Sequence, residues 1–165
     1  MSESVAIIGM PCAGKSSVGK IVAERLGATF IDTDEFIELS AGMTVGEIFE
    51  RYGESRFREL EIEAVRAATE VSGAVIAVGG GAVLRKENID ALKSSKTVYL
   101  RVSAEEVIRN LSGVDRPLLR GDAAGKVQRM MDEREGLYER AACVTVDADG
   151  LTLKQAAQAV IEALE

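Results

Sequence analysis

The chain has 165 residues, of which 47% are hydrophobic and 28% charged, and these proportions suit one globular domain with a substantial core. Its net charge of −7 argues against a nucleic-acid partner, and no apolar run approaches the roughly 20 residues that a membrane helix needs. The absence of histidine excludes imidazole catalysis, and two cysteines are too few for a disulfide framework or a zinc cluster. We therefore expect a single cytoplasmic domain, residues 1–165, without a secretory leader, a membrane partner or a nucleic-acid partner.

The first feature along the chain is a strand that runs into a glycine-rich loop. The apolar run Val5–Ile8 stops at Gly9, and Gly14-Lys15-Ser16 completes the spacing G-x-x-x-x-G-K-[ST]. The glycines let successive backbone N–H groups surround phosphate oxygens, the lysine adds a mobile charge, and the serine hydroxyl can bind Mg²⁺. A helix over Lys15–Leu26 points its positive dipole end at the anion. The sequence therefore predicts a nucleotide-phosphate site made by Pro11, Cys12, Ala13, Gly14, Lys15, Ser16 and Ser17.

Two acidic residues flank a threonine where the second predicted strand, Thr29–Ile31, ends. This segment, Asp32-Thr33-Asp34, lies at the strand end where open α/β sheets bind ligands. A helix N-cap is the alternative, since an apolar-periodic segment with Glu35 in its first turn follows. A cap needs only one of the two acids, so we favour a catalytic role.

A short helix over Thr44–Tyr52 and a longer one over Gly53–Glu70 follow, with the break at Gly53. The second helix begins with a charged segment, GESRFRELE. By composition alone, that segment indicates a solvated face held by salt bridges among Arg56, Arg58, Glu59 and Glu61.

The third strand, Ala74–Val78, runs directly into three glycines, Gly79-Gly80-Gly81. Such a run leaves backbone N–H groups open to something that approaches closely. Helical residues continue to about Lys93, and a fourth strand over Thr97–Val102 precedes Ser103, a helix N-cap.

The remaining third of the chain contains a non-periodic segment between helical and strand patterns. Residues 112–124 are rich in Gly, Asp, Pro and Arg, a composition typical of a mobile covering loop, or lid. A helix over Gly125–Arg140 and a strand over Cys143–Val146 follow. The last helix carries an apolar stripe that we interpret as core packing: Leu153, Ala156, Ala157, Val160, Ile161 and Leu164. Alternating strands and helices predict an α/β fold with one parallel sheet.

Taken together, these landmarks resemble those of shikimate kinases over nearly the whole chain. The matching segments are GMPCAGKSSVGK (9–20), DTDEFIE (32–38), GESRFRELE (53–61), GGG (79–81), RPLL (116–119) and REGLY (134–138). The resemblance implies a three-layer P-loop kinase fold of the nucleoside-monophosphate-kinase type. It further implies a five-stranded parallel sheet in order 2-3-1-4-5 with helices on both faces and a lid. Shikimate kinases transfer the γ-phosphoryl group of ATP to the 3-hydroxyl of shikimate with Mg²⁺, on the path through chorismate to aromatic amino acids.

For the nucleotide, the resemblance implies that Lys15 and the loop amides hold the phosphates. Ser16 would bind Mg²⁺ directly and Asp32 through water. Arg116 of the lid would close over the phosphates, and Arg109 would lie along the adenine.

For the acceptor, the resemblance assigns Asp34 to the hydroxyl groups of shikimate, where it would orient or deprotonate the attacking one. Arg58 and Arg134 would bind the carboxylate, with Glu61 holding Arg58 in place. Residues Gly79, Gly80 and Gly81 would contact the ring through backbone N–H groups. Lys15, Asp34 and Arg116 are thus the predicted catalytic residues, with ATP and shikimate as partners of a monomeric enzyme.

Several alternatives remain open at the level of sequence. Phe49 and Phe57 suit either the wall of an acceptor pocket or the core, and Cys12 is better read as a small filler than as a reactive thiol. A P-loop kinase for gluconate or a nucleoside monophosphate would keep the phosphate loop without the arginine pair. A non-catalytic nucleotide-binding protein would be expected to have lost Lys15, Asp34 or Arg116.

Overall fold

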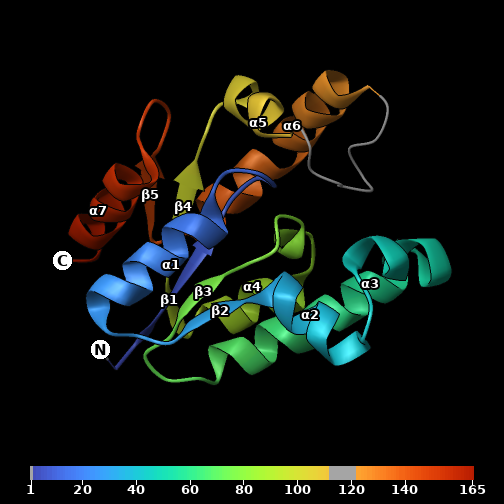
Figure 1. Cartoon of the computed structure of the whole chain (residues 1–165), viewed down its shortest axis with the longest axis horizontal. Coiled ribbons are helices and arrows are strands. Elements are labelled where there is room, and N and C mark those ends of the chain that lie inside the picture. Colours follow the sequence, from blue (N-terminus) through green and yellow to red (C-terminus); the bar gives the residue numbers. More distant parts are fainter. Residues whose placement is uncertain (1, 112–121) are drawn as a thin grey trace.

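A computed structural model describes residues 2–111 and 122–165 of the chain (Figure 1). Five strands form one sheet in the order β2-β3-β1-β4-β5, and every neighbouring pair is parallel. The predicted fold class and strand order are therefore confirmed. The strands are β1 (Ser4–Ile8), β2 (Phe30–Asp32), β3 (Val75–Ala77), β4 (Ser95–Arg101) and β5 (Val144–Asp147).

Helices pack against the sheet and against one another. α1 packs against α7 and β3, α3 packs against α4, and α5 packs against α6. At the end of the sheet that carries the loop after β1, α2 and α3 lie on one side and α5 and α6 on the other (Figure 1). The helices are α1 (Lys15–Leu26), α2 (Thr33–Ala41), α3 (Val45–Thr69), α4 (Lys86–Leu92), α5 (Ala104–Asn110), α6 (Ala123–Ala141) and α7 (Leu153–Leu164), with a 3₁₀ turn η1 (Ala82–Leu84).

The central strand β1 is buried along its whole length between β3 and β4. A strand covered on both faces needs a continuous apolar run, which explains why Val5–Ile8 has no alternation. Close packing next to it requires glycine. A Cβ at Gly9 would lie 2.6 Å from the Leu100 carbonyl oxygen, and one at Gly19 would lie 2.7 Å from the Phe30 ring. These contacts bring β1 against β4 and α1 against β2, which fixes the phosphate loop over the sheet.

The predicted elements are all present, with boundary shifts at several ends. The break at Gly53 is confirmed, because its backbone (φ 81°, ψ 172°) is not helical within α3. The helical stretch after the glycines divides into η1 and α4. Of the predicted lid, Asp122 caps α6, Ala123 and Ala124 form the first turn of that helix, and residues 112–121 lie outside the described residues.

The interpretation of the last helix as core packing is correct for part of its stripe and wrong for Leu153. Ala156, Ala157 and Val160 are buried, whereas Leu153 is 49% exposed. It is the first residue of α7, directly after the cap Thr152, and the buried residues of the helix begin only at Ala156. Within 2–111 and 122–165, no helix is both long and apolar enough to span a membrane.

Candidate active site

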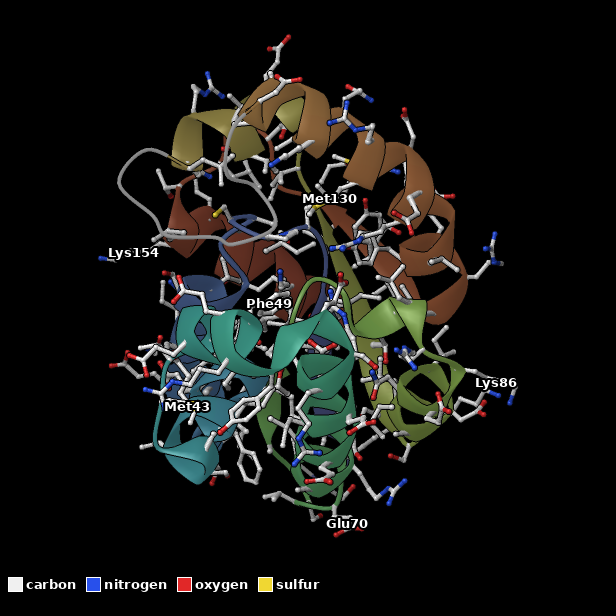
Figure 2. The ribbon with its side chains drawn as sticks, turned by 90° about the vertical axis from the view of Figure 1, so that its right-hand side faces the viewer. Met43, Phe49, Glu70, Lys86, Met130 and Lys154 are labelled. Carbon is white, nitrogen blue, oxygen red and sulfur yellow. The ribbon has the colours of Figure 1, made fainter. Side chains whose placement is uncertain are left out.

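A cavity of about 720 Å³ extends from the phosphate loop to α3 and α6. In Figure 2, Phe49 on α3 and Met130 on α6 mark its two flanks, and both residues line it. The predicted residues that the structure brings together in its lining are Pro11, Cys12, Gly14, Lys15, Ser16, Ser17, Asp32, Asp34, Arg58, Gly79, Gly80, Gly81 and Arg134. Ala13, also predicted, is buried in the same loop.

The phosphate loop has the backbone that its glycines predict. Gly14 has a left-handed conformation (φ 91°) and caps α1, and Cys12 also has a positive φ of 61°. The Lys15 ammonium donates to the carbonyl oxygens of Gly9 (2.8 Å) and Met10 (2.7 Å), so this cation is held against the loop. An amide from α5 supports the same loop, because Asn110 Nδ2 donates to the Cys12 carbonyl at 2.9 Å. No pattern in the sequence predicts this contact.

Asp32 caps α2, as the alternative interpretation predicted, and also contacts the phosphate loop. Its Oδ1 accepts from the N–H groups of Asp34 (2.9 Å) and Glu35 (3.2 Å), which caps α2, while its Oδ2 accepts a hydrogen bond from the Ser16 hydroxyl. Asp34 is not needed for the cap and lines the cavity. The threonine between the acids is fully buried and accepts from the Gly79 N–H at 2.9 Å.

The paired oxygens of Ser16 and Asp32 suit Mg²⁺, a hard cation that usually takes one or two carboxylates together with substrate phosphates. No group of three Asp, Glu, Cys or His side chains arranged for a metal occurs in the part of the chain that the structure describes. A magnesium ion held mainly by phosphate oxygens does not require such a cluster.

On α3, the prediction of a solvated charged face is wrong for Arg58 and Glu61. Their exposed fractions are 4% and 1%, and Arg58 Nη1 donates to Glu61 Oε1 at 2.8 Å. The prediction is right for Arg56 and Glu59, an ion pair of the same spacing that is about half exposed. Two residues correspond to a rotation of about 200° around a helix, so the two pairs lie on opposite sides of α3.

Burial raises the pKa of Glu61 above its ordinary value, and the nearby charge of Asp34 raises it further. The charge and the hydrogen bond of Arg58 oppose this rise, as does the charge of Arg134. The net direction is upward, so desolvation of the carboxylate outweighs the ion pair.

The three glycines after β3 allow close approach, as predicted, but what approaches includes the protein's own side chains. A Cβ at Gly79 would lie 2.5 Å from Glu61 Oε2, and one at Gly80 would lie 2.7 Å from Pro11 Cδ. A Cβ at Gly81 would overlap both terminal nitrogens of Arg58. The N–H of Gly79 already donates to Thr33, so a substrate contact through it, as the sequence predicted, is disfavoured.

Arg134 on α6 is 3% exposed and lines the cavity together with Arg58. Residues far apart in the sequence thus bring two guanidinium groups to one cavity. One turn further along α6, Tyr138 is fully buried and donates to the Gly80 carbonyl at 2.6 Å. In the sequence, Tyr138 was only part of a segment that matches the family, REGLY, and no role was predicted for it.

At the phosphate-loop end of the cavity, the lining includes residues that were not predicted, and the assignment of Arg109 to the adenine stays a prediction. Arg109 is exposed and does not line the cavity, whereas its neighbour Asn110 does. Leu153 also lines it, 3.5 Å from the Cβ position of Gly14. In the sequence, Leu153 belongs to the apolar stripe of the last helix, so no pattern there identified it as a lining residue. Arg116 lies outside the described residues.

The two phenylalanines on α3 both line the cavity, with ring centroids 4.9 Å apart. Phe57 is also buried in a small hydrophobic cluster with Ile37, Ile48 and Ala64. The two interpretations that the sequence left open therefore both hold for Phe57.

Comparisons with known proteins identify the relatives of this chain. The family model described as Shikimate kinase matches residues 11–165. The shikimate kinase of Thermodesulfovibrio yellowstonii is 39% identical over 166 aligned residues, which cover 99% of this chain and 95% of the relative. The chain belongs to the shikimate kinase family.

Solved structures of shikimate kinases agree with the fold. Shikimate kinase from Acinetobacter baumannii, solved in complex with shikimate, has a TM-score of 0.96 at 30% identity and covers 99% of this chain and 93% of that one. A gluconokinase from Sinorhizobium meliloti has a TM-score of 0.65 at 19% identity, with 99% and 91% covered, which shows a shared fold alone. The predicted family and P-loop kinase fold are confirmed.

Proposed function

We propose that this shikimate kinase homologue transfers the γ-phosphoryl group of ATP to the 3-hydroxyl of shikimate, with Mg²⁺. The observation that carries the proposal is the pair of buried guanidinium groups, Arg58 and Arg134, in the cavity that begins at the phosphate loop. A planar carboxylate is the ligand that two such groups bind best, because each guanidinium can form paired hydrogen bonds with it.

On the acceptor side, Arg58 and Arg134 anchor the carboxylate of shikimate. Glu61 Oε1 accepts a hydrogen bond from Arg58 Nη1 at 2.8 Å. This contact orients the guanidinium and therefore the remaining N–H groups of Arg58. The N–H groups of Gly80 and Gly81 contact the ring. Anchoring at one end places a hydroxyl group at the other end next to Asp34, which orients it or accepts its proton.

On the nucleotide side, the backbone amides of residues 11–17 surround the phosphates, and Lys15 exchanges its carbonyl contacts for phosphate oxygens. Ser16 and Asp32 would hold Mg²⁺, which neutralises phosphate charge when bound. Phosphoryl transfer needs mainly in-line positioning and positive charge, and these residues provide both. We place the base near Leu153 and Asn110, and the assignments of Arg109 and of Arg116 in the lid stay predictions.

We also propose that residues 1–165 form one catalytic domain that acts as a cytoplasmic monomer. Two observations support this setting. The cavity is lined by elements from both halves of one chain, and the two cysteines, Cys12 and Cys143, are unpaired thiols, as a reducing compartment favours.

A coupled ADP-release assay over several acceptors tests the proposed function. We expect turnover with shikimate, and none with gluconate, a nucleoside monophosphate or no acceptor. Turnover with gluconate or a nucleotide in place of shikimate would contradict the proposal, and ATP binding without turnover on any acceptor would favour a non-catalytic protein.

Variants of the two arginines test the acceptor half. Each charge-assisted contact is worth about 1.5–3 kcal/mol, so Arg58→Ala or Arg134→Ala should weaken shikimate binding about ten- to a hundredfold. ATP binding should stay nearly unchanged. Arg56→Ala, on the exposed side of the same helix, is the matched control and should bind shikimate like the wild type. Calorimetry with shikimate and with an analogue lacking the carboxylate measures these differences, and an arginine variant that discriminates as well as the wild type would refute the assignment.

A further inference from the structure

Tyr138 contacts two parts of the proposed acceptor site, the glycine loop after β3 and Arg134 on α6, but does not line the cavity itself. Its ring is fully buried and stacks on Tyr99, with centroids 5.1 Å apart and an interplanar angle of 27°. Its hydroxyl donates to the Gly80 carbonyl oxygen at 2.6 Å. The Met10 sulfur, a weak acceptor, lies 3.9 Å from the same hydroxyl. A phenol has one O–H group, so its single proton goes mainly to the closer and stronger acceptor, the Gly80 carbonyl.

The Gly80 carbonyl belongs to the same peptide unit as the N–H of Gly81. That unit is trans and planar, so its C=O and N–H point in opposite directions. Fixing the carbonyl of Gly80 on Tyr138 therefore fixes the direction of the Gly81 N–H. A hydrogen bond to a carbonyl also polarises its peptide unit and strengthens the N–H of that unit as a donor.

The oxygen of Tyr138 also interacts with Arg134, which lies one helical turn earlier in α6. Burial raises the pKa of Tyr138 well above its usual range, and the charge of Arg134 together with a hydrogen bond from it opposes that rise. Arg134 is itself 3% exposed, so the groups that orient it belong to the protein rather than to solvent. One phenolic oxygen thus joins the glycine loop after β3 to the arginine of α6.

We propose that Tyr138 is a positioning residue for the acceptor, whose hydroxyl holds the Gly81 N–H and the Arg134 guanidinium in their binding geometry. This inference rests on the proposed function, because it assumes that both groups bind the acceptor. It predicts that the hydroxyl matters for the acceptor more than for the nucleotide. Its close hydrogen bond is to Gly80, at 2.6 Å, whereas its contact with the phosphate loop, to the Met10 sulfur, is 3.9 Å long.

Tyr99 provides a matched control for the chemistry of this hydroxyl. Its ring is 1% exposed and forms the other half of the stack. Within the described residues its hydroxyl is buried without a hydrogen-bond partner. Tyr→Phe at either position keeps the stacked rings, but only at position 138 does it remove a hydrogen bond.

The test compares Tyr138→Phe with Tyr99→Phe by calorimetry with shikimate and with an ATP analogue, and by steady-state kinetics. Loss of one oriented hydrogen bond predicts shikimate binding weakened by about two- to tenfold in Tyr138→Phe. ATP-analogue binding should be unchanged, and Tyr99→Phe should match the wild type for both ligands. Urea unfolding of both variants shows whether the fold is kept.

Equal shikimate affinity in the two Phe variants would overturn the inference, provided that the wild type phosphorylates shikimate. A wild type that does not phosphorylate shikimate would instead refute the proposed function. The coupling to Arg134 has its own test, because Tyr138→Phe should cost less in an Arg134→Ala background than alone. Equal costs in both backgrounds would overturn that coupling.

In the wild type, the Gly81 amide proton resonance should move on addition of shikimate and stay in place with ADP alone, and the reverse would contradict the inference.

Discussion

Replacing Glu61 by glutamine tests whether the buried ion pair on α3 serves function or stability. Glu61→Gln keeps the shape of the side chain and an oxygen that accepts from Arg58, and removes only the charge. The carboxylate is 1% exposed, and its net pKa shift is upward, so burial costs the charged form more than Arg58 returns. We therefore expect the variant to be at least as stable as the wild type near neutral pH.

The pH dependence follows from the direction of that shift. A carboxyl group whose pKa is raised on folding contributes stability that is fully present below its unfolded value, 4.5, and is lost as the pH rises through its folded value. The wild type and Glu61→Gln should thus converge in unfolding free energy as the pH falls toward that value. The advantage of the variant should grow as the pH rises.

Urea unfolding at several pH values measures the difference in unfolding free energy. In thermal unfolding, each kcal/mol corresponds to a shift in melting temperature of about 2–4 °C for a domain of this size. Glu59→Gln is the matched control, because Glu59 pairs with Arg56 at the same spacing on the exposed side of α3. It should stay within about 0.5 kcal/mol of the wild type. A Glu61→Gln variant that loses more than about 1 kcal/mol near neutral pH would refute the desolvation argument, since the ion pair would then stabilise the fold.

The same variant should bind shikimate less tightly. A neutral amide holds Arg58 less firmly than a carboxylate does, so we expect a loss of about two- to tenfold in shikimate affinity with ATP binding unchanged. An unchanged shikimate affinity would mean that Glu61 does not orient Arg58.

Three further predictions concern the nucleotide half and the acidic pair. Asp32→Asn should lose activity that raised Mg²⁺ partly restores, whereas Asp34→Asn should lose turnover at every Mg²⁺ concentration. Steady-state kinetics at several Mg²⁺ concentrations measure this difference, and rescue of Asp34→Asn instead would mean that Asp34 serves the metal. Asn110→Ala should weaken ATP binding by about two- to tenfold, through loss of its hydrogen bond to the Cys12 carbonyl. The loss should be smaller in a Cys12→Gly background, because glycine adopts the positive φ of 61° without strain, and an equal loss would show that the hydrogen bond does not hold that conformation. Leu153→Ala should reduce affinity for an ADP analogue and leave shikimate affinity intact in titrations, and the opposite pattern would remove the base from that end of the cavity.

Much of the nucleotide half is determined by local sequence. The spacing of Gly9, Gly14, Lys15 and Ser16 specifies a loop in which neighbouring residues make the site, and the following helix begins at Lys15 as predicted. The alternation of apolar strands with helices likewise determines an α/β fold. The strand order came from the resemblance to a family, because local patterns do not say which strands become neighbours.

The acceptor half depended on tertiary structure, because its residues come from elements distant in the chain. Composition describes Arg58 and Arg56 in the same way, and only the packing of α3 decides that one is buried beside Gly81 while the other faces solvent. Tyr138 acquires its role because α6 brings its hydroxyl to a carbonyl group 58 positions away. Local periodicity specifies which side of a helix is apolar. Contacts between distant elements arise only when those elements pack, and such contacts decided which charged and polar groups meet at this site.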